Sequence, residues 1–427
     1  MEPAPKPPHE AKRLAALYQY HVLDTPREEA FDRVVRLVSR ILAAPMATVT
    51  LVDRDRQWFK ASCGVDSCET ARDISFCGHV VYRAEPVLVR DALADPRFHD
   101  NPLVTGPPYV RFYVGVPLQT AEGLPIGVLC AQDHVARPDG ISDEELASLC
   151  DLAALTVTEL ELRKADLQIH QELMLARRVI ERATDNATLG LPGVSYLHEP
   201  AGQLSGDVLL AAGRPVDGGY VFLIGDFTGH GLGAALGVPE LAGQFYDAVA
   251  SGMPCAELLA HLDARLERDL PAEMFLSAIL IEVLPGQRLL QVWNAGMPTV
   301  LTCSEGRVLE RIPSERLPLG IHPEASDRVE PALSRSFEPG ERLLAFSDGV
   351  SEIDQASGGM LGVEGMESLI RQELDTSCFD RIRDYVLAAR ELTREVDDLT
   401  LLSLELERLG DEEGSTGVDA SGLGFAG

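Results

Sequence analysis

Four apolar runs in the second half of the chain each adjoin an aspartate, and this pattern constrains the fold more than any other feature. The runs are short and rich in β-branched and aromatic residues, which is typical of buried strands. Since strand ends from distant parts of a chain can meet in one pocket, we expect the carboxylates to converge. They are Asp207 in GQLSGDVLLA, Asp226 in FLIGDFTGHG, Asp348 in RLLAFSDGVSE, and Asp397 with Asp398 in EVDDLTLLSLEL.

The segment IGDFTGHGLGAALG, residues 224–237, places Asp226 at the end of one such strand. Gly229 and Gly231 permit backbone conformations and close approaches that side chains would forbid, and small residues typical of a helix start follow them. A strand, an acid, a flexible turn and a helix predict a cradle for a cation or a phosphate.

Clustered carboxylates repel one another unless cations neutralise them, and the chain has no lysine after Lys164. An all-oxygen ligand set suits Mg²⁺ or Mn²⁺ rather than zinc. The missing lysines also exclude a Walker-type nucleotide loop, a kinase strand lysine and a Schiff-base lysine from the second half.

Length and charge limit the remaining possibilities. With 427 residues, of which 45% are hydrophobic, the chain is too long for one ordinary core, so we expect two domains and a connector. A net charge of −30 argues against binding nucleic acid or an anionic membrane. The sequence has neither a signal-peptide core nor an apolar run of about 18 residues, so we expect a cytoplasmic protein.

The chain is expected to fold as α/β (α+β) domains joined by a helix. A helical pattern begins with Ser142 as N-cap and has no evident stop before Asp185. The predicted parts are a disordered tail (1–12), a first domain (13–160), a helical linker (161–188), a second domain (189–408) and a disordered acidic, glycine-rich tail (409–427).

Two apolar stripes run along the predicted helix with a seven-residue spacing. This spacing favours a short parallel coiled coil between two protomers, and hence a homodimer. The alternative is a single helix packed on its own domain. The stripes are Leu160, Leu167 and Met174, and Leu155, Leu162 and Ile169.

Eight cysteines occur without a CxxC pair, which favours reduced thiols over a disulfide framework. Cys63, Cys68, Cys77 and His79 are close enough in sequence to raise the possibility of a zinc site, although their spacing matches no standard ligand pattern. Buried thiols are the other interpretation.

Residues 191–406 resemble the metal-dependent protein phosphatases of the PPM superfamily, in the branch of the stage II sporulation phosphatase and the sigma-factor regulators. The resemblance implies two packed β-sheets flanked by helices, an α-β-β-α sandwich with a metal site at the sheet edge. Its motifs are LP at Leu191, SGD ending at Asp207, GDFTGHG from Gly225, NAG from Asn294, PLG from Pro318, SDGVSE from Ser347 and DDLT from Asp397.

The resemblance also implies roles for these residues. Asp226 would be shared between two Mn²⁺ or Mg²⁺ ions, and the backbone carbonyl of Phe227 would ligate one of them. Two such ions can activate a water and clamp the oxygens of an in-line displacement. Asp207, Asp348 and Asp397 would complete the coordination, with Asp398 as the neighbouring alternative. Apart from the resemblance, His230 is expected to line the turn next to the metals or to cap the following helix, and a role as general acid is the alternative.

Three positions depart from the family pattern. Leu210 stands where a second acid is common, Met297 replaces the histidine of NAGH, and Pro239 falls inside the helix expected after the glycine turn. Pro239 predicts that this helix kinks or restarts.

The first domain, residues 13–163, resembles a GAF sensor domain. The similarity lies in DISFCGHVV, VRDALADPRFHDNPLV and FYVGVPLQTAEGLPIGVLCAQD, and it implies an antiparallel sheet with helices. A small-molecule ligand is possible but its identity is not predicted. Cys77 or Cys130 could anchor a chromophore, or both could be buried thiols.

Two functions follow from these resemblances. The first is a GAF-regulated serine/threonine phosphatase acting on a small phosphorylated regulatory protein of the anti-sigma-factor-antagonist type. The second is a non-catalytic signalling protein whose degenerate phosphatase fold binds a partner.

Overall fold

The computed structural model describes residues 3–229, 231–271, 273–321, 330–355, 358–371, 378–391, 393 and 397–410. By its contacts the chain divides into two compact units, residues 1–171 and 172–427. Within the described part of the chain, we find no helix with the length and apolarity required to span a bilayer. Of the tail predicted at 409–427, residues 411–427 lie outside the described residues.

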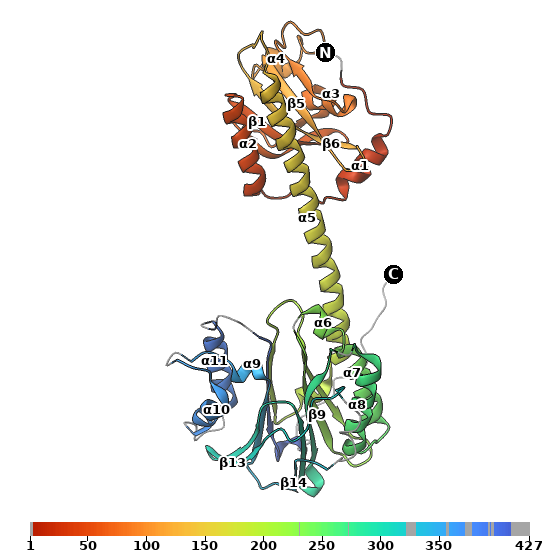
Figure 1. The fold of residues 1–427 in the computed structure, drawn as a ribbon, viewed down its shortest axis with the longest axis vertical. Coiled ribbons are helices and arrows are strands. Elements are labelled where there is room, and N and C mark those ends of the chain that lie inside the picture. The colour runs from red at the N-terminus through yellow and green to blue at the C-terminus, as the bar shows by residue number, and fades with distance from the viewer. Residues whose placement is uncertain are drawn as a thin grey trace, which may run out of the picture. The chain divides into compact units, whose positions relative to one another are not determined.

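A six-stranded antiparallel sheet with strand order β3-β2-β1-β6-β5-β4 forms the centre of the first unit (Figure 1). Strands β1 and β2 form one antiparallel hairpin of this sheet, and β5 and β6 form another. The strands are β1 (Met46–Val52), β2 (Arg56–Cys63), β3 (Glu69–Ala71), β4 (Val87–Val89), β5 (Phe112–Gln119) and β6 (Pro125–Asp133).

Helices cover both faces of this sheet because side chains alternate along its central strands. Val49 and Leu51 of β1 pack on one face with α1, α2 and α5. Met46 and Val52 of the same strand belong to the core on the other face, with α3 and α4. The helices are α1 (Glu10–Tyr18), α2 (Glu29–Ile41), α3 (Phe76–Arg83), α4 (Pro102–Thr105) and α5 (Asp143–Thr184). Helix α1 thus begins inside the segment 1–12 that was expected to be disordered.

Helix α5 matches the long helix predicted from Ser142 to Asp185. Ser142 and Glu145 form a capping box, because the Glu145 amide donates to Ser142 Oγ at 3.1 Å and the Ser142 amide donates to Glu145 Oε2 at 2.7 Å. The helix has 42 residues and ends at Thr184.

The two apolar stripes of α5 have different environments. Leu160 is 1% exposed and packs in the core of the first unit, so the stripe that it begins is partly an intradomain contact. Leu155, Leu162 and Ile169 are 61%, 61% and 55% exposed.

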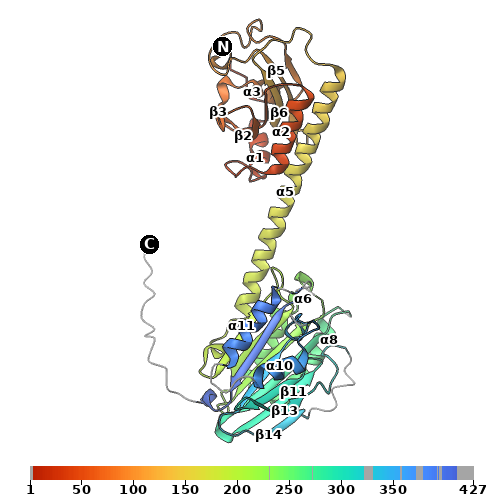
Figure 2. The ribbon, with the colours of Figure 1, turned by 90° about the vertical axis from the view of Figure 1, so that its left-hand side faces the viewer.

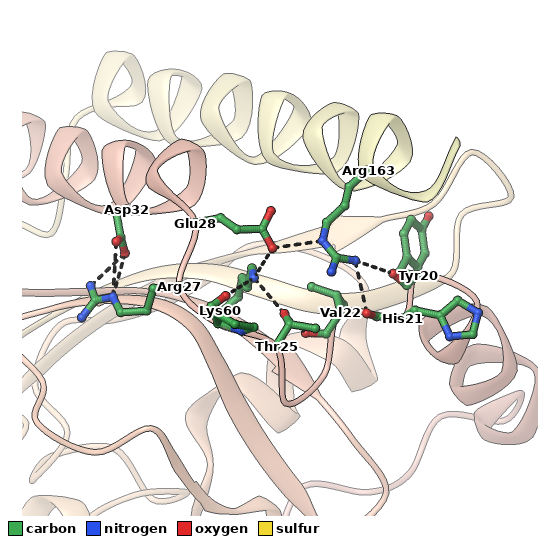
Figure 3. A network of polar contacts seen from close by, with 10 residues as sticks. Tyr20, His21, Val22, Thr25, Arg27, Glu28, Asp32, Lys60 and Arg163 are labelled. Atoms are coloured by element: carbon green, nitrogen blue, oxygen red, sulfur yellow. Dashed lines mark hydrogen bonds and ion pairs between the residues drawn. The ribbon is translucent and has the colours of Figure 1, made fainter. Parts of the chain in front are cut away.

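Helix α5 is fastened to the segment between α1 and α2 by a partly buried ionic network (Figure 3). The Glu28 carboxylate accepts hydrogen bonds from Lys60 Nζ at 2.5 Å and from Arg163 Nε of α5 at 3.0 Å. Arg163 also donates to the carbonyls of Tyr20 and His21. The Lys60 side chain is fully buried, so Glu28 supplies the counter-charge that its ammonium needs.

The second unit contains two five-stranded antiparallel sheets, in the orders β14-β11-β10-β9-β8 and β13-β12-β15-β16-β7. The strands are β7 (Val194–Glu199), β8 (Asp207–Gly213), β9 (Tyr220–Phe227), β10 (Leu276–Leu284), β11 (Leu289–Ala295), β12 (Val300–Ser304), β13 (Arg307–Ile312), β14 (Leu333–Ser336), β15 (Arg342–Phe346) and β16 (Leu399–Glu405). The helices are α6 (Leu232–Ala235), α7 (Val238–Ala250), α8 (Cys255–Asp269), α9 (Asp348–Ser351), α10 (Gly362–Arg371) and α11 (Cys378–Arg390).

These elements form four layers, with a helix pair outside each sheet (Figures 1 and 2). On β9, Leu223 packs against α7 and α8, whereas Ile224 points into the core between the sheets. On β15, Leu344 packs against α10 and α11, and Leu343 faces the core between the sheets. The predicted α-β-β-α sandwich and the antiparallel sheets are therefore confirmed.

The three departures from the family pattern have structural explanations. Leu210 is fully buried in the core between β8 and the α7–α8 layer, and Met297 is 4% exposed in the core between the sheets. Pro239 lies in the first turn of α7, which restarts at Val238 after α6. A proline is tolerated there because the first turn needs no amide donor.

Candidate metal centre

The predicted acids come from both sheets and lie at the ends of their strands. Asp207 opens β8 and stands directly opposite Asp226, near the end of β9. Asp348 is the first residue of α9, two residues after β15, and Asp397 and Asp398 immediately precede β16. Because the end of β15 pairs with the start of β16, the two acidic segments lie at the same end of these neighbouring strands.

Electrostatic effects show that these carboxylates are close. Burial, together with the charges of Asp348, Asp397 and Asp398, raises the pKa of Asp226 to about 7. Burial also raises the pKa of Asp207 well above its usual range, with a further contribution from Asp226. The pKa of Asp348 is raised by burial and by Asp397. Acids that are distant in sequence therefore repel one another across one site.

The neighbours Asp397 and Asp398 have different environments. Asp398 is 4% exposed, and its two carboxylate oxygens accept the amides of Ala201 at 2.6 Å and Gly206 at 2.7 Å. It thereby holds the loop that leads into Asp207. Asp397 is exposed, and its Oδ1 accepts the adjacent Asp398 amide at 2.8 Å. Asp397 is thus accessible from solvent, whereas Asp398 positions the backbone.

A chain of hydrogen bonds orients Asp207. Thr400 Oγ1 donates to Asp207 Oδ2 at 2.7 Å, and His198 Nδ1 lies 3.0 Å from the same hydroxyl oxygen. Since the hydroxyl proton goes to Asp207, His198 Nδ1 acts as the donor to Thr400. His198 and Thr400 are cross-strand partners on β7 and β16, so the sheet register fixes this chain.

Glycines in two segments of the site allow backbone conformations and close approaches near the acids. Gly229 and Gly231 have φ values of +88° and +73°, in the region that favours glycine, as the turn after Asp226 requires. At Gly349 a Cβ would lie 2.0 Å from the Asp398 carbonyl oxygen, so only glycine lets α9 begin beside β16.

A cavity of about 800 Å³ opens beside Asp397 and Asp398. Glu352 and Arg390 line it as well. Asp207 instead lines a second cavity of about 700 Å³, together with His198 and the last turns of α5. Asp207, Asp397 and Asp398 therefore border two hollows rather than one, and neither Asp226 nor Asp348 lines either of these two cavities.

The donor set fits Mn²⁺ or Mg²⁺ in its chemistry. Carboxylate oxygens are the ligands that these ions prefer, and a bound cation would relieve the repulsion that raises the Asp226 pKa. Within the residues described, however, no three His, Cys, Asp or Glu side chains are gathered closely enough to hold a metal ion. Ligation would therefore draw the carboxylates together. The residues considered as zinc ligands in the first domain, which the structure describes, do not form such a group either. Of these, Cys77 is buried and Cys68 is exposed.

Several residues of the site were not identified from the sequence. Burial raises the pKa of Glu352, and the charges of Asp348 and Asp397 raise it further, so this carboxylate belongs to the same cluster. It is the last residue of SDGVSE, and Thr400 is the last of DDLT, so both motifs contained the signal. His198 lies outside every motif. His230 is not among the described residues.

Comparison with known proteins identifies both halves of the chain. Residues 216–407 match the family model of Stage II sporulation protein E (SpoIIE), and residues 26–160 match that of the GAF domain. The chain joins a GAF domain to a SpoIIE-type phosphatase domain. Both predicted resemblances are confirmed.

Two curated relatives each share part of this GAF–SpoIIE chain. The chain is 35% identical over 179 residues to the cyclic di-GMP phosphodiesterase PA2567 of Pseudomonas aeruginosa, covering 42% of this chain and 30% of the relative. It is 25% identical over 191 residues to the phosphoserine phosphatase RsbP of Bacillus subtilis, covering 44% and 46%. The chain thus spans less than half the length of either relative.

Among solved structures, the SiaA-PP2C domain of Pseudomonas aeruginosa aligns with a TM-score of 0.48 at 20% identity. The alignment covers 56% of this chain and 98% of that domain.

Proposed function

We propose that this chain is a metal-dependent protein phosphatase that hydrolyses phosphoserine or phosphothreonine. The observation that carries the proposal is the position of Asp226, whose pKa is raised to about 7 by burial and by acids from the other sheet. A structural carboxylate would normally have a cationic or amide partner instead. The match of residues 216–407 to the SpoIIE family supports the same conclusion.

In this proposal two Mn²⁺ or Mg²⁺ ions are held by Asp207, Asp226, Asp348, Asp397 and the Phe227 carbonyl. Bound there, they would supply an activated water and neutralise charge on a phosphoryl group. Asp398 fixes the loop before Asp207, and Thr400 orients the Asp207 carboxylate. Arg390 lines the cavity next to Asp397 and is placed to bind a phosphate oxygen.

The proposed substrate is a small phosphorylated regulatory protein of the anti-sigma-factor-antagonist type, with the GAF domain controlling the rate. The partial match to RsbP, a phosphoserine phosphatase, supports phosphoserine as the reacting group. The test is manganese-dependent release of phosphate from a phosphoserine-bearing antagonist of this type. We expect release that EDTA abolishes, and no release from a phosphotyrosine peptide. Binding of the antagonist without any release would favour the non-catalytic alternative.

The non-catalytic alternative rested on Leu210 and Met297. Both side chains are buried in hydrophobic cores, where they contribute packing. Their presence leaves the acids of the centre unchanged, so we favour the enzyme.

Helix α5 is proposed to pair two protomers. Leu155, Leu162 and Ile169 are all more than half exposed at seven-residue spacing, which leaves an apolar stripe for a partner helix. Replacing both Leu162 and Ile169 with glutamate should convert a dimer to a monomer in light scattering, because like charges would face each other across the seam. The matched control places glutamates at the exposed Gln168 and Gln171, outside this stripe. A wild-type monomer, or a dimer that persists in the stripe variant, would contradict the pairing.

Thr400→Val is expected to weaken Mn²⁺ binding about 10–100-fold, the usual effect of losing a hydrogen bond that orients a metal ligand. The substitution preserves shape but removes the proton donated to Asp207 Oδ2. Titration calorimetry measures the affinity. Thr302→Val, another buried threonine of the same sheet, is the control and should bind Mn²⁺ normally. Equal affinities would show that Thr400 does not position a ligand.

The metal-free protein should lose stability as the pH rises from about 4 to about 7. The pKa of Asp226 is about 7 in the folded chain against an ordinary value of 3.8, so the folded state binds the proton more tightly than the unfolded state. Its contribution is therefore complete below pH 4 and is lost as the carboxyl ionises. Melting temperatures measured with EDTA should show this decline, and Asp226→Asn should reduce it. A decline of the same size in the variant would mean that Asp226 does not titrate in this range.

A further inference from the structure

The core of the GAF domain contains two cysteines whose sulfur atoms face each other. Cys77 lies in the first turn of α3, and Cys130 lies on β6 beneath that helix. Their Sγ atoms are 3.9 Å apart, and the residues are 2% and 0% exposed. They therefore form a close pair of reduced thiols inside an apolar cluster.

Polar groups surround this pair, which is unusual for thiols that only fill space. Thr48 Oγ1 lies 3.1 Å from Cys130 Sγ, and Gln132 Nε2 donates to the same sulfur at 3.7 Å. Tyr113 Oη donates to Cys77 Sγ at 3.4 Å. These groups come from β1, β6 and β5, so three strands direct hydrogen-bonding atoms at the two sulfurs.

The two thiols have different acidities. The hydrogen bond from Cys77 is the main cause that lowers the pKa of Cys130 to about 7. Burial raises the pKa of Cys77 well above its usual value. Since the thiolate is the nucleophile, Cys130 is suited to react first, because the Thr48 hydroxyl, the Gln132 amide and the Cys77 thiol all lie within hydrogen-bonding distance of its sulfur.

We propose that Cys77 and Cys130 are a dithiol pair that small hydroperoxides oxidise to a disulfide, and that the GAF domain responds to hydroperoxides through this reaction. The Cys130 sulfur attacks one peroxide oxygen, forming an S–O bond while the O–O bond breaks and the other oxygen leaves as an alcohol or water. The Cys77 sulfur then attacks Cys130, forming the S–S bond and releasing water. In total two thiols give up two electrons and two protons to one hydroperoxide, which is reduced to an alcohol and water.

Burial selects the oxidant and couples the reaction to the fold. Bulky disulfides cannot reach sulfurs that are at most 2% exposed, whereas hydrogen peroxide is nearly as small as water. An S–S bond of about 2.05 Å requires the sulfurs to approach from 3.9 Å, which draws the first turn of α3 toward β6. The Phe76 ring in that turn stacks on the Phe98 ring, with their centroids 4.2 Å apart. Formation of the disulfide therefore shifts the aromatic packing on this face of the sheet.

The test treats the full-length chain with hydrogen peroxide, blocks the remaining thiols, digests the protein and analyses it by tandem mass spectrometry. We expect a linked pair of peptides that lacks two hydrogen atoms, with fragmentation placing the bond between Cys77 and Cys130 and excluding Cys150. Dithiothreitol added to the unfolded protein should break the link. Cys255→Ser, which removes another buried cysteine, should leave the link intact.

Cys77→Ser supplies a second measurement. Without its partner, the Cys130 sulfenic acid should persist and react with dimedone once the protein is unfolded in the presence of that reagent. Two results would overturn the proposal: both cysteines staying reduced at peroxide levels that oxidise the exposed Cys68, or each being oxidised without a link in the wild-type chain. The test does not depend on the proposed phosphatase activity, because its readout is the covalent state of the GAF domain.

Discussion

Replacing Asp226 with asparagine is expected to lower manganese-dependent hydrolysis of a chromogenic phosphate ester by about 10³-fold. Asp226 stands opposite Asp207, the acids of the other sheet help to raise its pKa, and it is the residue proposed to be shared between two cations. Removing its charge should eliminate most of the electrostatic stabilisation of the reacting phosphoryl group. Loss of one such stabilising group slows other hydrolases by about 10²–10³-fold. The rate is measured against Mn²⁺ concentration, so that weaker binding and slower chemistry are separated.

The matched control is Asp247→Asn, which removes the same charge from an exposed position on α7. It should leave the rate unchanged. Activity that persists in Asp226→Asn, or activity that does not require metal, would contradict the proposed chemistry.

Asp397→Asn and Asp398→Asn are expected to fail in different ways, although the two residues are adjacent. Asp398→Asn should lower the free energy of unfolding of the second unit by about 3 kcal/mol, because one of the two backbone amides loses its charged acceptor and faces an NH₂ group instead. Asp397→Asn should change stability by less than about 0.5 kcal/mol, since the residue is exposed and asparagine keeps an oxygen for the Asp398 amide.

Activity should show the opposite order when both variants are assayed under conditions where they are folded. Asp397→Asn should lose at least about 100-fold, because a proposed ligand is removed. Denaturant unfolding and the ester assay together check the prediction. If Asp398→Asn is as stable as the wild type, or if Asp397→Asn is fully active, the division of roles between the two neighbours is wrong.

The layers of the fold could be predicted from the sequence because they follow from local patterns. Alternation along β9 places Leu223 and Ile224 on opposite faces, and each face needs its own cover. Pro239 predicted the restart at α7, and Ser142 predicted the start of α5. These features depend on residues that are close in sequence.

The details of the site depend on contacts between distant residues, and the sequence did not predict them. The role of Asp398 depends on the amides of Ala201 and Gly206, nearly 200 residues away. The chain from His198 to Asp207 exists only because β7 pairs with β16 in one register. Likewise, Cys77 and Cys130 become neighbours only when α3 packs on β6. Motifs indicated which acids matter, while the sheet register determines what each one contacts.

Anomalous diffraction from crystals grown with Mn²⁺ tests the central claim most directly, because it locates the metal without assuming any activity. We predict two manganese peaks about 3.5–4 Å apart, with the Asp226 carboxylate between them and Asp348 and Asp397 drawn toward them. Manganese bound elsewhere, or no peak at these carboxylates at saturating Mn²⁺, would contradict the account.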